Sequence, residues 1–208
     1  GIETDKVSRE WLQGANLMDL IVVSSNHSKD VFESTMYIPS LSIEKPIEVL
    51  FEGVDFNTYK PTTELTPYLN SQLSLIKNDF NFLFIGQWLP GELGYDRKNI
   101  GKLIEVFCDT FQHFRVKPGL ILKTHLSNFS QIDLERLEMR IRSLKKQTNV
   151  DIYLLHGELS NKEVNQLYNY DKVKSLISFT MGEGYNRPFA EFSTSSKPSI
   201  ISNWSGHL

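Results

Sequence analysis

The sequence predicts an α/β protein, with a Rossmann-like parallel sheet flanked by helices. Short apolar runs of strand length alternate with longer stretches of helical periodicity along almost the whole chain. Strands joined through helices need crossover connections, which make the strands parallel and cover both faces of the sheet. Of the 208 residues, 40% are hydrophobic and 23% are charged, so the chain can form a core and is not disordered.

The first quarter of the chain contains a small set of elements. Helix-like sequence starts within a few residues of Gly1, and the span 19–25 contains the buried strand Leu-Ile-Val-Val. A polar-led helix follows to about Ser34, and residues 47–51 form the next strand. The stretch 52–77 is rich in Pro, Thr and Asn, which predicts a linker with one helical turn.

Strands and helices alternate regularly from residue 82 onward. Apolar side chains at intervals of three or four residues indicate the helices. Ser160 and Glu163 form a capping box before one helix, and Pro188 takes its favoured place at the start of another. Residues 87–96 hold one proline and two glycines, which predicts a loop. The expected strands are 82–85, 120–122, 150–155, 176–179 and 199–201, and the expected helices are 100–114, 132–144, one from 161 and one from 188.

Ligands of open parallel sheets bind beyond the carboxyl ends of the strands, so the residues that follow each strand are the candidates for a site. The strongest signal is the turn from Gly182 to Glu191. Its glycines allow a ligand to approach the backbone, and the helix N-terminus suits a phosphate. Glu183 and Glu191 are acceptors for hydroxyl groups. The alternative is a plain strand-to-helix turn in which Glu191 complements the helix dipole.

Composition and motifs exclude several other classes. A net charge of -3 gives no general attraction to nucleic acid. The chain has neither a dinucleotide fingerprint after a strand nor a P-loop. Cys108 is the only cysteine, which excludes a disulfide framework and a cysteine-based zinc site. We therefore expect no cofactor and no metal, and the lone cysteine favours a cytoplasmic location.

Several segments carry a family pattern in one collinear order. Glu183 and Glu191 form a motif of two glutamates separated by seven residues. The other matching segments are 14–28, Val49–Asp55 with Tyr59-Lys60-Pro61, Phe82–Gly86 with Arg97-Lys98-Asn99, Leu122-Lys123, and His156–Ser160. Together they resemble the retaining glycosyltransferases of family 4 (glycosyl transferases group 1). The fold of that family, GT-B, pairs two Rossmann-like domains.

The resemblance implies a donor site for a nucleotide diphosphate sugar. Glu191 would accept hydrogen bonds from the ribose, and Glu183 would lie near the donor sugar as a catalytic residue. Lys98 would be the second catalytic residue, because it would neutralise the diphosphate leaving group, whose charge grows in the transition state. The remaining donor-binding residues implied are Gly86, Arg97, Lys123, His156, Gly184, Tyr185, Asn186, Arg187 and Pro188.

The chain departs from the family pattern at several places, among them the longer loop 87–96 and Ser195-Ser196-Lys197, and some residues have simpler interpretations. Gln87-Trp88 follows the first glycine where the family has an arginine or a small residue, so Arg97 takes over as the second phosphate cation. Asn186-Arg187 replaces the commoner Gly-Leu and adds a positive charge. Lys98 and Lys123 fit an ordinary surface lysine as the alternative, and His156 fits simple packing at a strand end.

Three parts are expected from this resemblance. Residues 1–52 would be the C-terminal remnant of an acceptor domain, 53–77 a hinge, and 78–208 the donor domain, truncated at its C-terminus. Both ends of the chain look cut from a longer protein. The isolated chain is therefore expected to bind donor without transferring sugar.

The parent protein is expected to be a metal-independent hexosyltransferase of polysaccharide biosynthesis. It would move a sugar from a nucleotide diphosphate sugar to a saccharide-type acceptor with retention of configuration. The acceptor would bind through the missing N-terminal domain, and the full-length enzyme would have peripheral membrane contact but no nucleic-acid partner. The alternatives are a non-catalytic nucleotide- or sugar-binding module, or a sugar epimerase or phosphorylase of the same fold.

Overall fold

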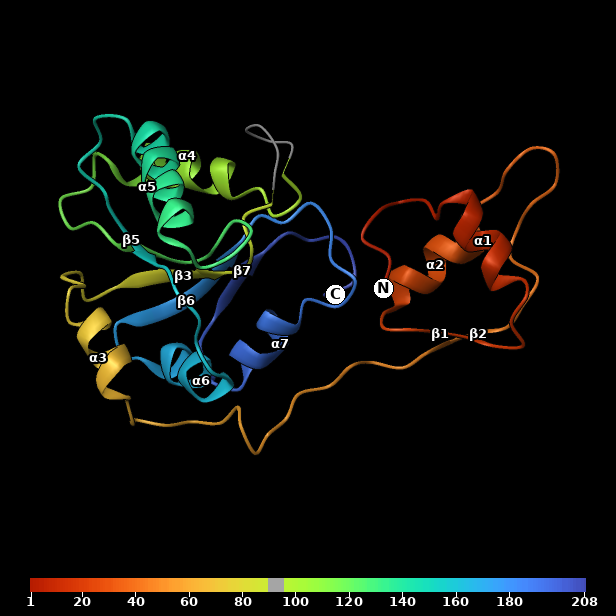
Figure 1. The fold of residues 1–208 in the computed structure, drawn as a ribbon, viewed down its shortest axis with the longest axis horizontal. Helices are drawn as coiled ribbons and strands as arrows, with labels where there is room; N and C mark the ends of the chain where they lie inside the picture. The colour runs from red at the N-terminus through yellow and green to blue at the C-terminus, as the bar shows by residue number, and fades with distance from the viewer. Residues whose placement is uncertain (90–95) are drawn as a thin grey trace. The chain divides into compact units, whose positions relative to one another are not determined.

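The computed structural model describes residues 1–89 and 96–208, which form two compact units (Figure 1). The first unit contains Gly1–Gly53 together with Met181–Arg187 and Ser202–Leu208. The second unit contains Val54–Thr180 and Pro188–Ile201. The first unit thus combines the N-terminal segment with two segments from the far end of the chain. The acceptor, hinge and donor roles expected for 1–52, 53–77 and 78–208 stay predictions.

The second unit is built on a five-stranded parallel sheet, which confirms the fold class expected from the sequence. The strand order is β5-β4-β3-β6-β7. All five residues of β4 pair with all five residues of β5. The strands are β3 (Asn81–Ile85), β4 (Gly119–Lys123), β5 (Asp151–Leu155), β6 (Val173–Ser178) and β7 (Ser199–Ile201).

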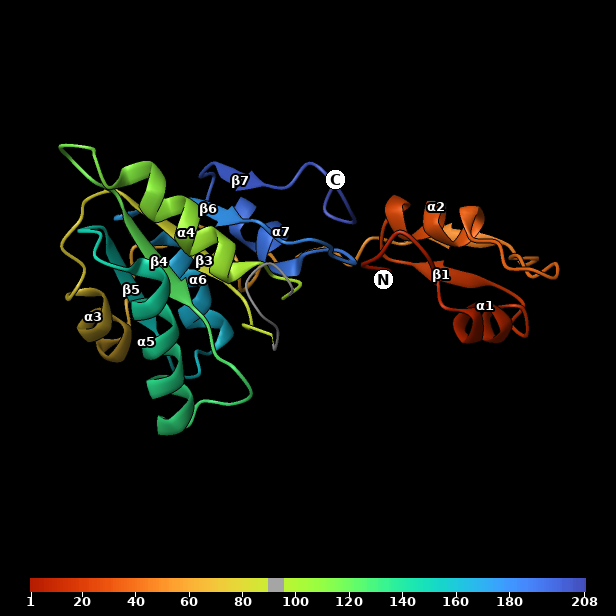
Figure 2. The ribbon, with the colours of Figure 1, turned by 90° about the horizontal axis from the view of Figure 1, so that it is seen from above.

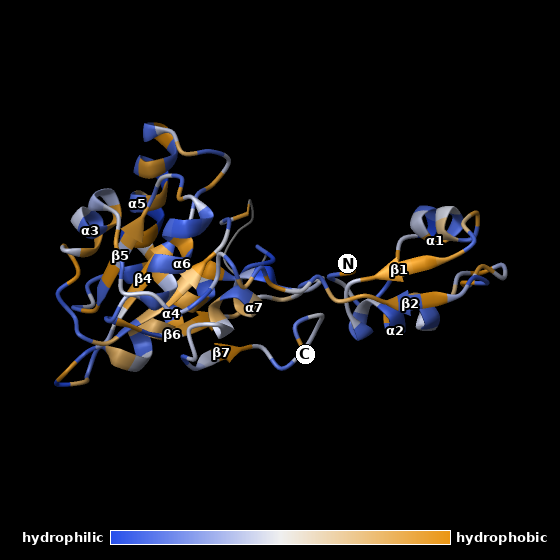
Figure 3. Cartoon of the chain, turned by 90° about the horizontal axis from the view of Figure 1, so that it is seen from below, coloured by the Kyte–Doolittle hydropathy of each residue, from blue (hydrophilic) through white to orange (hydrophobic). Residues whose placement is uncertain are grey.

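Helices cover both faces of this sheet, and each face has its own apolar core (Figure 1). Successive residues of a strand point to opposite faces, so Phe84 packs in one core and Leu83 in the other. Figure 2 shows α4 and α5 in front of the strands, and Figure 3 shows strands more hydrophobic than the helices around them. One face carries α4 (Ile100–Phe111) and α5 (Gln131–Lys145), and the other carries α3 (Pro67–Leu73), α6 (Asn161–Asn169) and α7 (Arg187–Ser193).

Helix α3 corrects the expected linker with one turn over 52–77. The structure has a helix of 7 residues there, which is about two turns. The side chain of Thr66 accepts a hydrogen bond from the Leu69 N–H, and Pro67 occupies the first turn. A Pro- and Thr-rich segment is typical of loops, but the same residues also start helices. Burial of Leu69 and Leu73 against the sheet favours the helix here.

The first unit has two short parallel strands and two helices. These are α1 (Arg9–Ala15), β1 (Ile21–Val23), α2 (Asn26–Ser34) and β2 (Ile47–Val49). Leu12 and Val31 belong to its apolar core. In residues 1–89 and 96–208, no helix is both long enough and apolar enough to cross a membrane.

Candidate functional site

Beyond the carboxyl ends of the second unit's strands, hydrogen bonds join the segments that follow these strands. The Gly86 N–H donates to the Lys123 carbonyl at 3.1 Å, and the Trp88 N–H donates to the His125 carbonyl at 2.8 Å. After β6, the Thr180 hydroxyl donates to the Arg97 carbonyl at 3.3 Å. The segments after β3, β4 and β6 therefore meet at one edge of the sheet. Of the loop predicted over 87–96, residues 90–95 lie outside the described residues.

Gly86 and Lys98 lie side by side at this edge. Gly86 has φ 156°, a conformation that L side chains rarely adopt. A Cβ atom there would lie 3.3 Å from Cζ of Phe84 and 3.9 Å from Cε of Lys98. The missing side chain therefore leaves backbone accessible beside a lysine, the combination that the sequence predicted for phosphate binding.

The start of α4 is capped in an unusual way. Asn99 occupies the N-cap position in the left-handed conformation, with φ 54°, and its side chain makes no capping hydrogen bond. Asp96 takes that role, because its Oδ1 accepts from the Ile100 N–H at 3.4 Å. Burial raises the pKa of the Asp96 carboxyl, and the hydrogen bonds from the helix start oppose this shift. The Asn99 amide oxygen is buried and has no hydrogen-bond partner among the described residues.

Lys123 is the last residue of β4 and is buried, with 8% of its surface exposed. Its Nζ donates to the Gly157 carbonyl at 2.6 Å and lies 5.1 Å from the centre of the Phe129 ring. Burial lowers the pKa of Lys123 to about 8, while the nearby Glu158 acts to raise it. A bound anion would stabilise the protonated lysine, so the position suits a phosphate better than an uncharged ligand.

Phe129 is a site residue that the sequence analysis missed. Its ring centre lies 4.6 Å from that of His125 and 5.8 Å from that of His156. Burial and the charge of Lys123 lower the pKa of His125. The signal that could have found Phe129 is its position directly before Ser130, the N-cap of the helix that follows a strand ending in lysine. The side chains of Lys123, His125, Phe129 and His156 form a mixed cationic and aromatic cluster after β4 and β5.

Three polar atoms at this edge are buried and have no hydrogen-bond partner within the described ranges. They are the Thr124 hydroxyl, Nε2 of His156 and Oδ1 of Asn99. A buried polar group without a partner costs about 1–3 kcal/mol. Such groups in a native fold call for an explanation, and a polar ligand or ordered water is the ordinary one.

Glu191 lies in α7 of the second unit and is buried, with 7% of its surface exposed. The hydroxyl of Tyr168, on α6, donates to Glu191 Oε2 at 3.2 Å. The Tyr168 ring also packs edge-on against Phe192. Glu191 is thus fixed by a neighbouring helix, which is more than the helix-dipole alternative requires.

Glu183 and its neighbours belong to the first unit. The Glu183 N–H donates to the Ser205 hydroxyl at 2.8 Å, and that hydroxyl donates back to the Glu183 carbonyl at 2.8 Å. The Tyr185 hydroxyl accepts from the Gly53 N–H at 3.2 Å, and the Ser24 hydroxyl donates to the Gly184 carbonyl at 3.2 Å. These bonds hold the turn against other segments of the first unit.

The predicted site residues therefore fall into two groups. The second unit holds Gly86, Arg97, Lys98, Lys123, His156, Pro188 and Glu191, and the first unit holds Glu183, Gly184, Tyr185, Asn186 and Arg187. Asn186 is buried in the left-handed conformation, with φ 64°, and its Nδ2 has no hydrogen-bond partner in the described part of the chain. Across residues 1–89 and 96–208, no group of three or more His, Cys, Asp or Glu could hold a metal ion.

Comparisons with known proteins give a fold. No family model and no curated protein matches the chain, but solved structures do. The E. coli trehalose-6-phosphate structure bound with UDP-2-fluoro glucose matches with TM-score 0.64 and 15% identity, over 95% of this chain and 49% of that chain. HepE of Anabaena, in complex with UDP-glucose, matches with TM-score 0.61 and 18% identity. The match covers 95% of this chain and 49% of HepE.

A third structure matches over a more equal share of both chains. The C-terminal domain of a glycosyl transferase group 1 family protein from Francisella tularensis has TM-score 0.50 and 14% identity, over 72% of this chain and 70% of that one. Together these likenesses define the class of fold as the Rossmann-like, C-terminal domain type of GT-B proteins. The chain spans about half the length of the first two proteins that it resembles.

Proposed function

We propose that this chain is the donor-binding part of a glycosyltransferase that uses a nucleotide diphosphate sugar. The observation that supports the proposal is the arrangement of lysines and buried polar atoms at the carboxyl edge of the second unit's sheet. Lys98 lies beside the backbone of Gly86, and Lys123 ends the neighbouring strand. Buried polar atoms without partners among the described residues lie at the same edge. Charge for a diphosphate and acceptors for hydroxyl groups are thus provided within one rigid sheet edge.

Each part of the ligand has a matching group in this proposal. Lys98, Arg97 and Lys123 would bind the diphosphate, because charge-assisted hydrogen bonds to phosphate are the strong ones. Glu191, oriented by Tyr168, would accept from the ribose hydroxyls. Phe129 would offer its face to the base, since aromatic rings stack on any base.

The sugar end of the donor is assigned on the family resemblance alone. Glu183 would lie near the anomeric centre, and Gly184, Tyr185, Asn186, Arg187 and Pro188 would complete the phosphate-binding turn. On the same ground we place the parent enzyme in retaining family 4, without a metal, in the cytoplasm and in polysaccharide biosynthesis. The saccharide acceptor would bind the other Rossmann-like domain of the GT-B fold, and peripheral membrane contact would belong to the full-length enzyme.

The identity of the bound molecules in two of the similar structures suggests which donor to test first. One contains UDP-2-fluoro glucose and the other UDP-glucose. At 15% and 18% identity these ligands are a starting point for this chain and no more. A uridine diphosphate hexose is therefore the first candidate donor.

Calorimetric titration of UDP, GDP, ADP and the three nucleosides into the 208-residue chain tests the donor site. We expect one diphosphate to bind in the micromolar to millimolar range and its nucleoside to bind more weakly. If none of the six binds, the donor site is refuted. A transfer assay with UDP-glucose on the same preparation should give no product, because acceptor orientation supplies much of the rate. Binding without transfer by the full-length protein would favour the non-catalytic module.

A further inference from the structure

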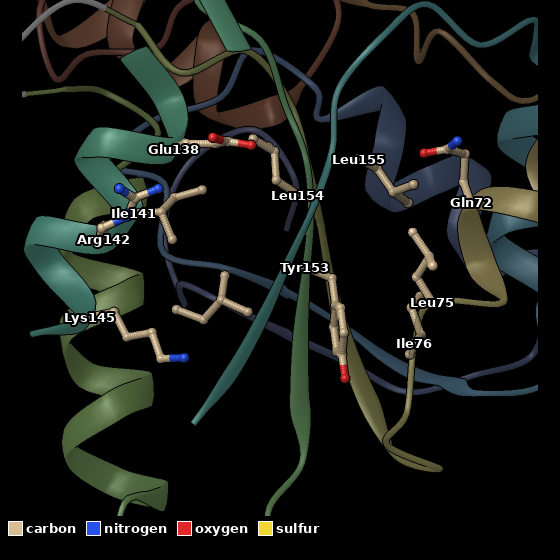
Figure 4. Close-up of a pocket in the computed structure, with 11 residues that line it drawn as sticks. Gln72, Leu75, Ile76, Glu138, Ile141, Arg142, Lys145, Tyr153, Leu154 and Leu155 are labelled. Carbon is tan, nitrogen blue, oxygen red and sulfur yellow. The ribbon is translucent and has the colours of Figure 1, made fainter. Parts of the chain in front are cut away.

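The two edge strands of the five-stranded sheet differ in length and in what borders them. Strand β7, at one edge, has three residues. Strand β5, at the other edge, has five residues, and all of them pair with β4 on one side. On its other side, β5 has no strand partner among residues 1–89 and 96–208. A groove of about 440 Å³ opens along it instead (Figure 4).

The groove has β5 as its floor and a helix on each side. Figure 4 shows Leu154 directed toward α5, while Tyr153 and Leu155 are directed toward α3. Tyr153 is held in place because its hydroxyl accepts from the Lys77 N–H at 3.1 Å and donates to the Asn78 side chain. The lining residues are Gln72, Leu75 and Ile76 from the α3 side, Glu138, Ile141, Arg142 and Lys145 from α5, and Ile152–Leu155 from β5.

This edge lacks the features that usually prevent strand pairing. Natural edge strands are blunted by prolines, bulges, inward charges or short length. The sequence of β5, Asp-Ile-Tyr-Leu-Leu, has a charge only at its first residue and no proline, and its register with β4 is regular. At the mouth of the groove, 67% of Leu75 is exposed. A groove of this form fits an added strand.

The direction of the chain determines where the charged residues of α5 lie along β5. Because β4 and β5 are parallel and α5 connects them, α5 runs antiparallel to β5. Lys145 therefore lies beside the start of β5 and Glu138 beside its end, as Figure 4 shows. Lys145 lies seven positions after Glu138, which corresponds to about 10 Å along the helix. The groove thus has a basic end and an acidic end.

We propose that the occupant of this groove is a second copy of the same chain, with its β5 strand paired antiparallel to this one. A two-fold axis perpendicular to the sheet reverses the order of the charges. Glu138 of each copy then faces Lys145 of the other, and Ile141 and Arg142 lie nearest the axis, so two pairs of opposite charge offset one approach of like-charged arginines. Parallel pairing of the two β5 strands would instead place the two α5 helices on opposite faces of the joined sheet, where their charges could not pair. The interface closes on itself after two copies, as isologous interfaces do.

This proposal is independent of the proposed function. The candidate donor residues follow the carboxyl ends of the strands, whereas the groove runs along the side of β5. Changes on α5 that prevent the dimer should therefore leave nucleotide binding unchanged. Nucleotide titration of the same variants separates a failure of the one proposal from a failure of the other.

Sedimentation equilibrium of the 208-residue chain tests the interface directly. We expect a mass twice the monomer's 24.0 kDa that falls toward the monomer on dilution and at high salt, because screening weakens the paired charges. Glu138→Lys and Lys145→Glu should each weaken the dimer at least tenfold, and the double variant E138K/K145E should restore it. The matched controls are Glu135→Lys and Arg136→Glu, on the same helix outside the groove, which should leave the dimer constant unchanged.

Two results would overturn the proposal. One is a wild-type chain that stays at 24.0 kDa at protein concentrations up to about 0.1 mM, a weak-binding limit. The other is a dimer that the single charge reversals leave intact or that the double reversal does not rescue. Cross-linking gives an independent measurement. Arg142→Cys, near the axis, should oxidise to a covalent dimer faster than Arg136→Cys, and equal rates would contradict the two-fold arrangement.

Discussion

Lys197 at the amino end of the sheet is half-buried and Lys123 at the carboxyl end is buried, and burial lowers the pKa of each to about 8. Nζ of Lys197 donates to the carbonyls of Tyr168 and Tyr170, both at 2.8 Å. These bonds join the start of β7 to the segment before β6. Nζ of Lys123 donates to the Gly157 carbonyl, and the hydroxyl of the next residue, Thr124, has no partner among the described residues.

The difference extends to the other polar side chains at the two ends. At the amino end, Asn81 donates to the carbonyls of Asn78 and Lys172 at 2.7 and 3.0 Å, and Lys172 donates to the Ile76 carbonyl at 2.9 Å. These bonds connect loops to one another and stabilise the fold. At the carboxyl end three buried polar atoms lack a partner among the described residues, against one at the amino end, Oδ1 of Asn81, and such groups are typical of ligand sites. Changes at the amino end should therefore affect stability, and changes at the carboxyl end should affect binding.

The largest expected effect is on stability, at the amino end. A Cβ atom on Gly119 would lie 2.1 Å from Oδ1 of Asn81 and 3.0 Å from the Tyr153 ring. Gly119→Ala should displace Asn81 and lower the free energy of unfolding by about 3 kcal/mol, through overpacking and lost hydrogen bonds. Chemical denaturation measures this, with Gly14→Ala as the control, because nothing lies within 4 Å of that Cβ. A folded Gly119→Ala variant with weakened nucleotide binding would contradict the claim that the amino end of the sheet affects stability alone.

The ends of the strands could be predicted from the sequence, because they depend only on the order of residues within short segments of the chain. Gly86, Lys98 and Lys123 each follow or end a strand, and the rule for parallel sheets then places them at one edge. Phe129 could not be found in this way, because its position depends on how the loop after β4 folds. The Asp133 carboxylate fixes that loop by accepting from the Ser127 and Asn128 N–H groups.

Other features were missed because their signals were ambiguous or not local. The Thr-Pro start of α3 predicts a linker as readily as a helix, since the same residues are common in loops. The lack of partners for Thr124 and Asn99 is a property of packing, which no sequence pattern reports. The pairing of Glu191 with Tyr168 joins two helices that the sequence could place but not orient.

The next effect in size concerns Glu191 at the carboxyl end. If Glu191 binds ribose hydroxyls, Glu191→Ala removes a charged acceptor worth about 1.5–3 kcal/mol, or roughly ten- to hundredfold in nucleotide affinity. Calorimetry with the nucleoside and with its diphosphate should show the same loss for both. Asp109→Ala, on the exposed surface of α4, is the control. Unchanged affinity together with a lower melting temperature would show that Glu191 serves only the fold.

A smaller and more selective effect is expected at Lys98. Its proposed partner is the diphosphate, so Lys98→Ala should weaken diphosphate binding roughly tenfold and leave the nucleoside unaffected. Rising salt should reduce the difference between wild type and variant. Lys102→Ala is the matched control, because Lys102 lies four residues further along the chain, in α4, and pairs only with nearby Glu105 among the bonds seen. Equal losses for diphosphate and nucleoside would refute the role of Lys98.

The smallest expected effect is a pH dependence with opposite signs for stability and for binding. The pKa of Lys123 is about 8 in the fold, below its ordinary value of 10.5. Between these two values the unfolded chain binds more protons, so this residue makes stability rise with pH in that window. Lys197 contributes with the same sign. Diphosphate binding needs the protonated lysine, so affinity should fall about twofold from pH 7 to pH 8 and more steeply above.

The two lysines make this prediction testable by substitution. Lys123→Met should abolish the fall in diphosphate affinity above pH 7, whereas Lys197→Met should keep the fall and lose only part of the rise in stability. At pH 8, calorimetry in buffers of different ionisation enthalpy should detect proton uptake when diphosphate binds wild type, because the anion raises the pKa of Lys123. The same measurement on Lys123→Met should show none. Proton uptake that survives Lys123→Met, or that disappears in Lys197→Met, would place the anion away from the carboxyl end of β4.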